Sequence, residues 1–107
     1  MATFNEVWRD ILQRLCEGTE IPNWSYESGY TGNATRIERL NYDEVVVTGK
    51  NTKGPRSVPR IDFQTVFEHW GRYKQGLVPR GEIAGISRNA TYILSVLHWL
   101  EQPNEAE

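Results

Sequence analysis

Apolar residues near the start of the chain recur at the spacing of one helix face. They are Phe4, Val7, Trp8, Ile11, Leu12 and Leu15. Such intervals of three and four residues predict an amphipathic helix. Thr3 and Glu6 form the pattern T-x-x-E, a capping box that places the beginning of this helix at Thr3. Gly18 favours its end.

The pattern changes to that of strands in the middle of the chain. Residues 35–40 and 44–48 are rich in apolar and β-branched side chains, and residues 41–43 join them, which predicts a hairpin. Trp24 and Tyr26 alternate within residues 19–34, a segment rich in Gly, Ser and Asn, so both a short strand and an aromatic loop fit this segment. We expect an antiparallel sheet of two or three strands.

Residues 50–60 form a basic loop with the sequence KNTKGPRSVPR. Pro55 and Pro59 exclude a helix, and the segment can return as a brief edge strand near Val58. The positive charges of the basic loop are Lys50, Lys53, Arg56 and Arg60.

The last third of the chain predicts three helices. The first is expected to have Asp62 as its N-cap and to end at Gly76. Its buried face is expected to hold Phe63, Val66, Phe67, Trp70 and Tyr73. Pro79 begins a short helix that runs to about Ala84. Ser87 is expected to cap the last helix, which Pro103 follows, and residues 103–107 are expected to be a disordered acidic tail.

Strands grouped together and helices grouped together favour an α+β fold. The chain of 107 residues has the length of one domain and contains no internal repeat. We therefore expect a single small domain over residues 1–107. It consists of an N-terminal helix, the small antiparallel sheet and a C-terminal part of three helices.

The last two helices, joined at Gly85, have the order of a helix-turn-helix, in which the second helix lies in the major groove of DNA. The residues that open this second helix can bind bases or phosphates; they are Arg88, Asn89 and Thr91. Tyr92 and Trp99 make the same helix apolar around most of its circumference, which is typical of a central core helix. Both interpretations fit the pattern.

The net charge of −2 conceals an uneven distribution. Residues 1–49 carry four basic and eight acidic residues, whereas residues 50–90 carry eight basic and three acidic residues. The basic middle favours phosphate contacts, because the local field matters more than the total charge. Close packing of the helices would add Arg72, Lys74, Arg80 and Arg88 to the same surface. Alternatively, the basic loop is a solvated segment that protects the edge of the hairpin from aggregation.

The aromatic residues Trp24, Tyr26 and Tyr30 support a second hypothesis. Trp and Tyr are favoured anchors of protein interfaces, so an aromatic loop can bind a protein partner or a second copy of the chain. The same rings can instead cover the core of the small sheet.

Few residues support catalysis or metal binding. His69 and His98 lie on different predicted helices and match no metal-binding spacing, and Cys16 is the single cysteine. We expect no enzymatic activity, no metal and no cofactor. The N-terminus lacks the pattern of a signal peptide and no apolar run has the length of a membrane span, so we expect a cytoplasmic protein without a membrane partner.

The residues Leu77–Val78–Pro79–Arg80–Gly81 match the recognition pattern of thrombin. They fall in the joint between two predicted helices, which we expect to be exposed and open to cleavage. Resistance of the folded protein would indicate a packed joint.

Two segments, IDFQTVFEHWGRYKQG and SRNATYILSVLHWL, combine an aromatic helix that ends in a Trp-x-x-Tyr-x-x-Gly unit with a Thr-Tyr-Ile helix. This pattern, within residues 61–100, resembles small accessory domains attached to bacterial restriction and phage-defence proteins. The resemblance covers less than half of the chain. It implies an association with DNA-handling systems and no active-site residues.

These observations favour a non-enzymatic DNA-binding module that uses the basic loop and the last helix. The expected contact residues are Lys50, Lys53, Arg56, Arg60, Arg72, Arg88, Asn89 and Thr91. The alternative is a protein-interaction module, such as a small phage or bacterial adaptor or inhibitor, anchored by Trp24, Tyr26 and Tyr30. The DNA hypothesis requires the basic residues to share one surface.

Overall fold

The computed structural model describes residues 3–50 and 52–102, so the predicted acidic tail at 103–107 lies outside the described residues. The helix α1 (Phe4–Arg14) precedes four strands: β1 (Glu20–Ser25), β2 (Gly29–Leu40), β3 (Glu44–Gly49) and β4 (Arg56–Pro59). Three helices follow: α2 (Arg60–Lys74), α3 (Arg80–Ile86) and α4 (Ala90–Glu101). The predicted α+β class is confirmed.

The four strands form an antiparallel sheet in the order β1-β2-β3-β4. The prediction of two or three strands was therefore too low. Residues 20–25 form a true strand, because they pair with residues 29–36 of β2. The short β4 pairs with β3 from Arg56 to Pro59, where an edge strand was expected. Of the two alternatives for this segment, the short strand is therefore the one found, and pairing with β2 supplies what the local pattern left open.

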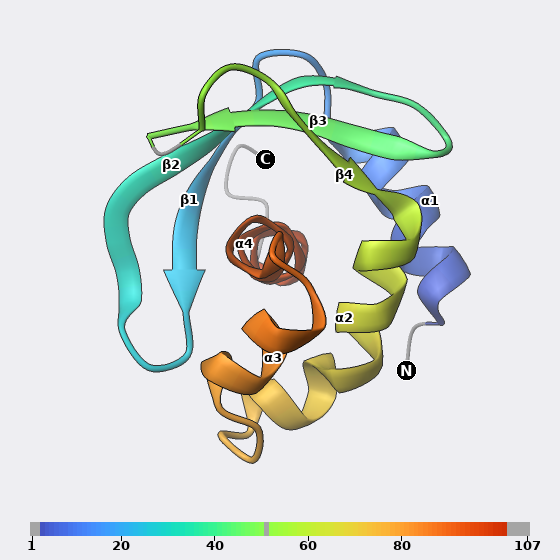
Figure 1. The fold of residues 1–107 in the computed structure, drawn as a ribbon. Coiled ribbons are helices and arrows are strands. Elements are labelled where there is room, and N and C mark those ends of the chain that lie inside the picture. Colours follow the sequence, from blue (N-terminus) through green and yellow to red (C-terminus); the bar gives the residue numbers. More distant parts are fainter. Residues whose placement is uncertain (1–2, 51, 103–107) are drawn as a thin grey trace.

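The long strand β2 changes partner along its length. Residues 29–36 pair with β1, and residues 35–40 pair with β3. The pairing moves from Pro22–Ala34 to Trp24–Tyr30, so residues 31–33 form a bulge opposite Asn23. Gly32 in this bulge has a φ of +89°, which glycine adopts without steric cost. A bulge bends a strand, and the β1–β2 hairpin curves around α4 (Figure 1).

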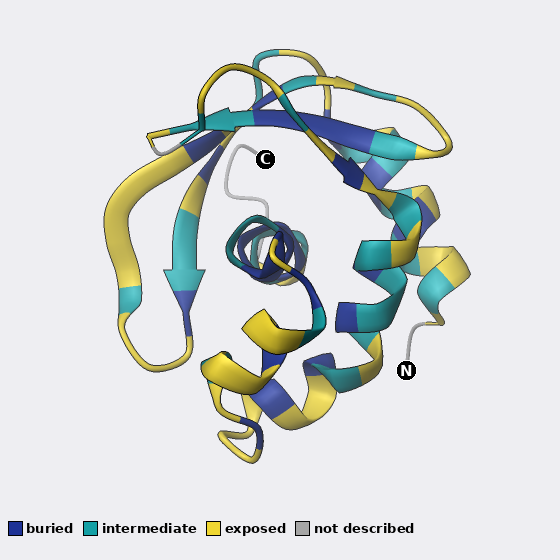
Figure 2. Ribbon diagram, viewed as in Figure 1, coloured by how far each residue is buried: buried dark blue, intermediate teal, exposed yellow. Residues whose placement is uncertain are grey.

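The helix α4 occupies the centre of the molecule. Figure 1 shows it end-on, with the sheet, the β1–β2 hairpin, α2 and α3 around it. Ala90 and the unbroken run Ile93–Leu97 are buried (Figure 2). Ser95 in this run is buried with its hydroxyl satisfied, since it donates to the Thr91 carbonyl at 2.8 Å and accepts from the Trp24 N–H at 3.0 Å. The interpretation as a core helix is confirmed, and α4 cannot present its length to a DNA groove.

The beginning of α4 differs from the prediction. Asn89, rather than Ser87, is the N-cap residue, and Arg88 and Asn89 precede the helix instead of opening it. The Ser87 hydroxyl accepts from the Asn89 N–H at 3.0 Å and donates to Asp62 at 2.9 Å. Ser87 therefore shapes the turn between α3 and α4, because its side chain binds a residue outside the helix.

The beginning of α2 also differs. The chain passes directly from β4 into the helix, with Pro59 as the N-cap residue and no side-chain cap. Asp62, predicted as the N-cap, lies within the first turn of α2. Its carboxylate accepts hydrogen bonds from Ser87 and Asn89 at 2.9 and 3.0 Å, so it links α2 to the α3–α4 turn.

The tip of the β1–β2 hairpin is held on the joint between α2 and α3. The hydroxyl of the fully buried Tyr73 donates to Glu27 at 2.9 Å and accepts from the Tyr26 N–H at 2.9 Å. Burial raises the pKa of Tyr73 to about 12. The other carboxylate oxygen of Glu27 accepts from the Arg80 N–H at 3.0 Å, which satisfies a free donor at the beginning of α3. The joint is exposed at Leu77, Pro79 and Gly81, as expected, but Val78 is buried and the hairpin tip binds the beginning of α3.

We expect the folded protein to resist thrombin at Arg80–Gly81. Val78 is 4% exposed, and both the N–H and the side chain of Arg80 are bound, by Glu27 and Thr91. A protease needs the bond in an extended, accessible segment. Digestion should leave the native protein intact under conditions that cleave a peptide of residues 75–84. Thrombin should cleave the Glu27→Ala variant faster than the wild type. Rapid cleavage of the wild-type protein would contradict the packing described here.

Candidate nucleic-acid interface

The loop between β3 and β4 lies beside the beginning of α4. Together they border an open depression with a volume of about 390 Å³. Its lining residues are Thr52, Lys53, Gly54, Pro55, Arg56 and Arg88. Gly54 has a φ of +90°, a conformation that favours glycine. Residues more than thirty positions apart in the sequence thus share one surface, as the DNA hypothesis requires.

A smaller depression of about 110 Å³ adjoins the first, since Arg88 lines both. Its other lining residues are Asn23, Asn33, Gly49, Lys50, Thr91 and Tyr92. These residues come from β1, β2, the end of β3 and the first turn of α4. We call the two depressions together the basic surface. It contains Lys50, Lys53, Arg56, Arg88 and Thr91 of the predicted set.

A chain of hydrogen bonds holds the two halves of the basic surface together. Arg56 Nε donates to Asn89 Oδ1 at 2.7 Å, and Asn89 Nδ2 donates to Asp62 Oδ2 at 3.0 Å. The Arg56 guanidinium also lies 5.7 Å from the centre of the Tyr92 ring, within the range of a cation–π contact. Asn89 is 4% exposed, so its amide positions Arg56 and is not available to read a base.

The remaining cations of the basic surface form no ion pair with a carboxylate in the described part of the chain. The ion pairs among the described residues join Arg14 to Asp10, Arg36 to Glu20 and Glu38, and Lys74 to Glu101. Lys50, Lys53 and Arg88 are exposed and belong to none of these pairs. The Thr91 hydroxyl accepts a hydrogen bond from Arg80, which brings a further cation to this surface.

Arg60 lies away from the basic surface, at the beginning of α2. Its guanidinium is 5.1 Å from the Phe4 ring centre, 5.9 Å from that of Trp8 and 5.2 Å from that of Tyr42. Asn5 Oδ1 accepts from it at 3.1 Å. Arg60 therefore packs α1 and the β2–β3 turn against α2, and the structure does not bring it to the other predicted contacts.

Arg72 is also separate. Its guanidinium is 3.0 Å from His69 Nδ1, and it lines a different, largely apolar depression of about 650 Å³ with Phe4, Phe67 and Trp70. Lys74 borders the same depression and pairs with Glu101 at 2.9 Å. The expected extension of the basic surface along α2 is therefore absent.

The aromatic segment is part of the packed structure at one end and exposed at the other. Trp24 stacks on His98 with ring centres 4.0 Å apart and an angle of 8°, and its edge faces Trp70 at 6.1 Å. Tyr26 and Tyr30 are 49% and 59% exposed. The segment predicted as a protein anchor thus leaves its two tyrosines on the surface, whereas Trp24 covers the core.

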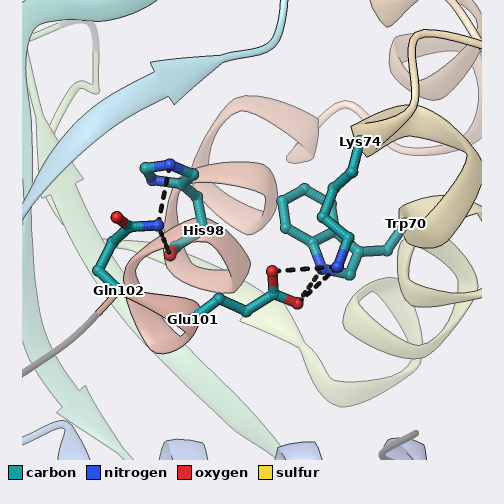
Figure 3. Close-up of polar contacts among 5 residues, drawn as sticks. All are labelled: Trp70, Lys74, His98, Glu101 and Gln102. Atoms are coloured by element: carbon teal, nitrogen blue, oxygen red, sulfur yellow. Dashed lines mark hydrogen bonds and ion pairs between the residues drawn. The ribbon is translucent and has the colours of Figure 1, made fainter.

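The two histidines have separate surroundings. His98 Nε2 is 3.2 Å from Gln102 Nε2, while the nearby Glu101 carboxylate accepts from the Trp70 indole N–H at 2.8 Å and from Lys74 (Figure 3). The Glu101 contacts tie the ends of α2 and α4 together. His69 contacts Arg72 on α2. Within residues 3–50 and 52–102, no three His, Cys, Asp or Glu side chains lie close enough together to hold a metal ion.

Four residues of the basic surface were not predicted from the sequence: Asn23, Asn33, Gly49 and Tyr92. They come from separate elements, and only the pairing of the strands and the position of α4 bring them together. The alternation of Trp24 and Tyr26 was the one sequence signal for β1, and it did not predict which residues of β2 pair with it.

No protein-family model, curated protein or solved structure matches the chain. The resemblance of residues 61–100 to accessory domains of restriction and phage-defence proteins stays a prediction. None of the described helices combines the length and the apolar character needed to cross a bilayer.

We expect Asn89→Ala to lower the free energy of unfolding by about 1–3 kcal/mol, because it removes the amide that accepts from Arg56 and donates to Asp62. Chemical denaturation measures this loss. The matched control is Asn33→Ala, which removes an exposed amide and should change the free energy of unfolding by less than about 0.5 kcal/mol. Equal values for the two variants would contradict the role given to Asn89.

We expect His98 to titrate below its ordinary pKa of 6.5, because burial lowers the pKa and outweighs the opposing Glu101 carboxylate. The folded state then binds the proton more weakly than the unfolded state. His98 therefore contributes stability above pH 6.5 that is lost as the pH falls from 6.5 toward the folded pKa. NMR titration gives the pKa directly. Between about pH 7.5 and pH 5, His98→Gln should lose less stability than the wild type; an equal loss would contradict the assignment.

Proposed function

We propose that the chain is a non-enzymatic module that binds nucleic acid through the phosphate backbone. The observation that carries the proposal is the meeting of Lys50, Lys53 and Arg88 on one surface without carboxylate partners from the described residues. Phosphate neutralisation by Lys and Arg supplies most of the affinity in sequence-independent binding. A total charge of −2 does not oppose this, because the field of the basic surface acts locally.

The proposed mode of binding differs from that of a helix-turn-helix. The buried run Ile93–Leu97 keeps α4 within the core, so only its first turn reaches the nucleic acid, through Thr91 and the preceding Arg88. The loop residues 52–55 supply the opposite wall. Arg56 supports the surface from within, because it is held by Asn89 and Tyr92.

The alternative, a protein-interaction module, retains the exposed Tyr26 and Tyr30 as its support. Trp24, the residue with the largest apolar area in that hypothesis, is occupied by His98 and Trp70. Hot spots need a large side chain that is free to enter a partner's pocket. The basic surface is therefore the better supported of the two.

Binding is tested with fluorescently labelled oligonucleotides at several salt concentrations. We expect binding at low salt that weakens steeply as salt rises. The double variant Lys53→Gln/Arg88→Gln should weaken binding and lower the slope of log K against log salt by about 1.8 on duplex DNA, since each lost phosphate contact removes about 0.9.

The matched control is Arg9→Gln/Arg72→Gln, which removes the same charge from exposed positions outside the basic surface. It should leave the affinity nearly unchanged. Absence of binding by the wild type at low salt would refute the proposal. Equal losses in the two double variants would show that net charge, rather than this surface, controls binding.

A further inference from the structure

We propose that the smaller depression of the basic surface accepts one unstacked nucleotide, so that the chain prefers single-stranded to duplex nucleic acid. This inference rests on the proposed function, and it names the substrate class of the same surface. Its basis is the composition of the 110 Å³ depression, where two amide side chains and one aromatic ring lie beside two cations.

The wall formed by the strands carries hydrogen-bonding groups. Asn23 from β1 and Asn33 from the β2 bulge line the depression. Asn23 Oδ1 accepts from the Thr35 hydroxyl at 2.6 Å, which fixes this amide and leaves its NH₂ as a donor. The Asn33 side chain forms no hydrogen bond with other described residues, so it can both donate and accept. Paired carboxamides are suited to the edge of a nucleobase.

The helix α4 also contributes to the depression. Tyr92 lines it, and the Arg56 guanidinium lies 5.7 Å from the centre of the Tyr92 ring, which holds that ring in place. The Tyr92 Cε1 atom would lie 3.7 Å from a β-carbon at Gly49, so the ring also packs against the end of β3. A flat, fixed aromatic wall favours contact with a flat heterocycle.

Cations also border the depression, where the phosphates of the bound nucleic-acid strand would lie. Lys50 and Arg88 both line the smaller depression, and Arg88 and Lys53 continue into the larger one. A strand can therefore place its base between the amides and Tyr92 while its phosphates follow Arg88 toward Lys53.

A duplex cannot use the smaller depression in this way. Its bases are stacked and their pairing edges are occupied, and extrusion of one base costs a few kcal/mol in a regular duplex. A single strand presents its base edges and faces without that cost. Duplex DNA would consequently contact only Lys53, Arg88 and Lys50, as sequence-independent phosphate contacts.

The test compares labelled single strands of DNA and of RNA with a DNA duplex of equal length at low salt, by fluorescence anisotropy. We expect a single strand to bind about tenfold more tightly than the duplex. The DNA and RNA arms show which sugar the surface accepts. Equal affinity for duplex and single strands, or a preference for duplex, overturns this inference and leaves the proposed function in place. Absence of all binding overturns both.

Asn33→Ala and Asn33→Asp examine the depression itself. Each should weaken single-strand binding by about fivefold or more, with the acidic variant weaker because its charge opposes the phosphates. The neutral variant Asn33→Ala should leave duplex affinity within about twofold. The control Gln13→Ala removes an exposed amide from α1 and should change neither. Circular dichroism confirms that the variants fold. An unchanged single-strand affinity in both Asn33 variants overturns the inference.

Discussion

The burial of α4 is the constraint on which the rest of the structure depends. A chain of this length has one core, and this core is built around a helix whose middle residues Ile93–Leu97 are all buried. A helix apolar on every side needs covering on every side. The sheet, α2 and α3 provide part of that cover, and the bent β1–β2 hairpin provides the remainder (Figure 1). The positions of Arg88, Thr91 and Tyr92 at the basic surface follow from this arrangement.

The same constraint explains how the basic surface is assembled. Because α4 lies inside, only its beginning reaches the surface beside the β3–β4 loop, where Arg88 lines a depression with the loop residues. Asn89 closes the contact, since its buried amide joins Arg56 on β4 to Asp62 on α2. A polar residue that is fully hydrogen-bonded in this way specifies one geometry for the turn, because any displacement leaves charged groups without partners.

Local sequence patterns predicted the helices and the β2–β3 hairpin, but not the full sheet or the contacts between elements. The capping box at Thr3 and the apolar faces of α1 and α2 were read correctly, because these signals lie within a few residues of one another. The strand β1 was ambiguous, since its conformation depends on pairing with β2 and on a hydrogen bond from Trp24 to Ser95. Asp62 and Ser87 were assigned as caps because both residue types favour that position. Their side chains bind each other across the fold instead, and no local pattern predicts such a contact.

The bulge in β2 has a consequence for how the molecule behaves in a crowded solution. Residues 29–34 pair with β1 on one side, and β3 begins to pair only at Thr35, so no strand among residues 3–50 and 52–102 pairs with the other edge of this stretch. Such an edge, uncharged over six residues, is ordinarily a template for sticking to other chains. The bulge at residues 31–33, with Gly32 at positive φ, breaks the flat ladder that a second strand would need. Backbone shape, rather than charge, keeps the longest strand from joining a neighbouring molecule, and the same irregularity places Asn33 at the depression.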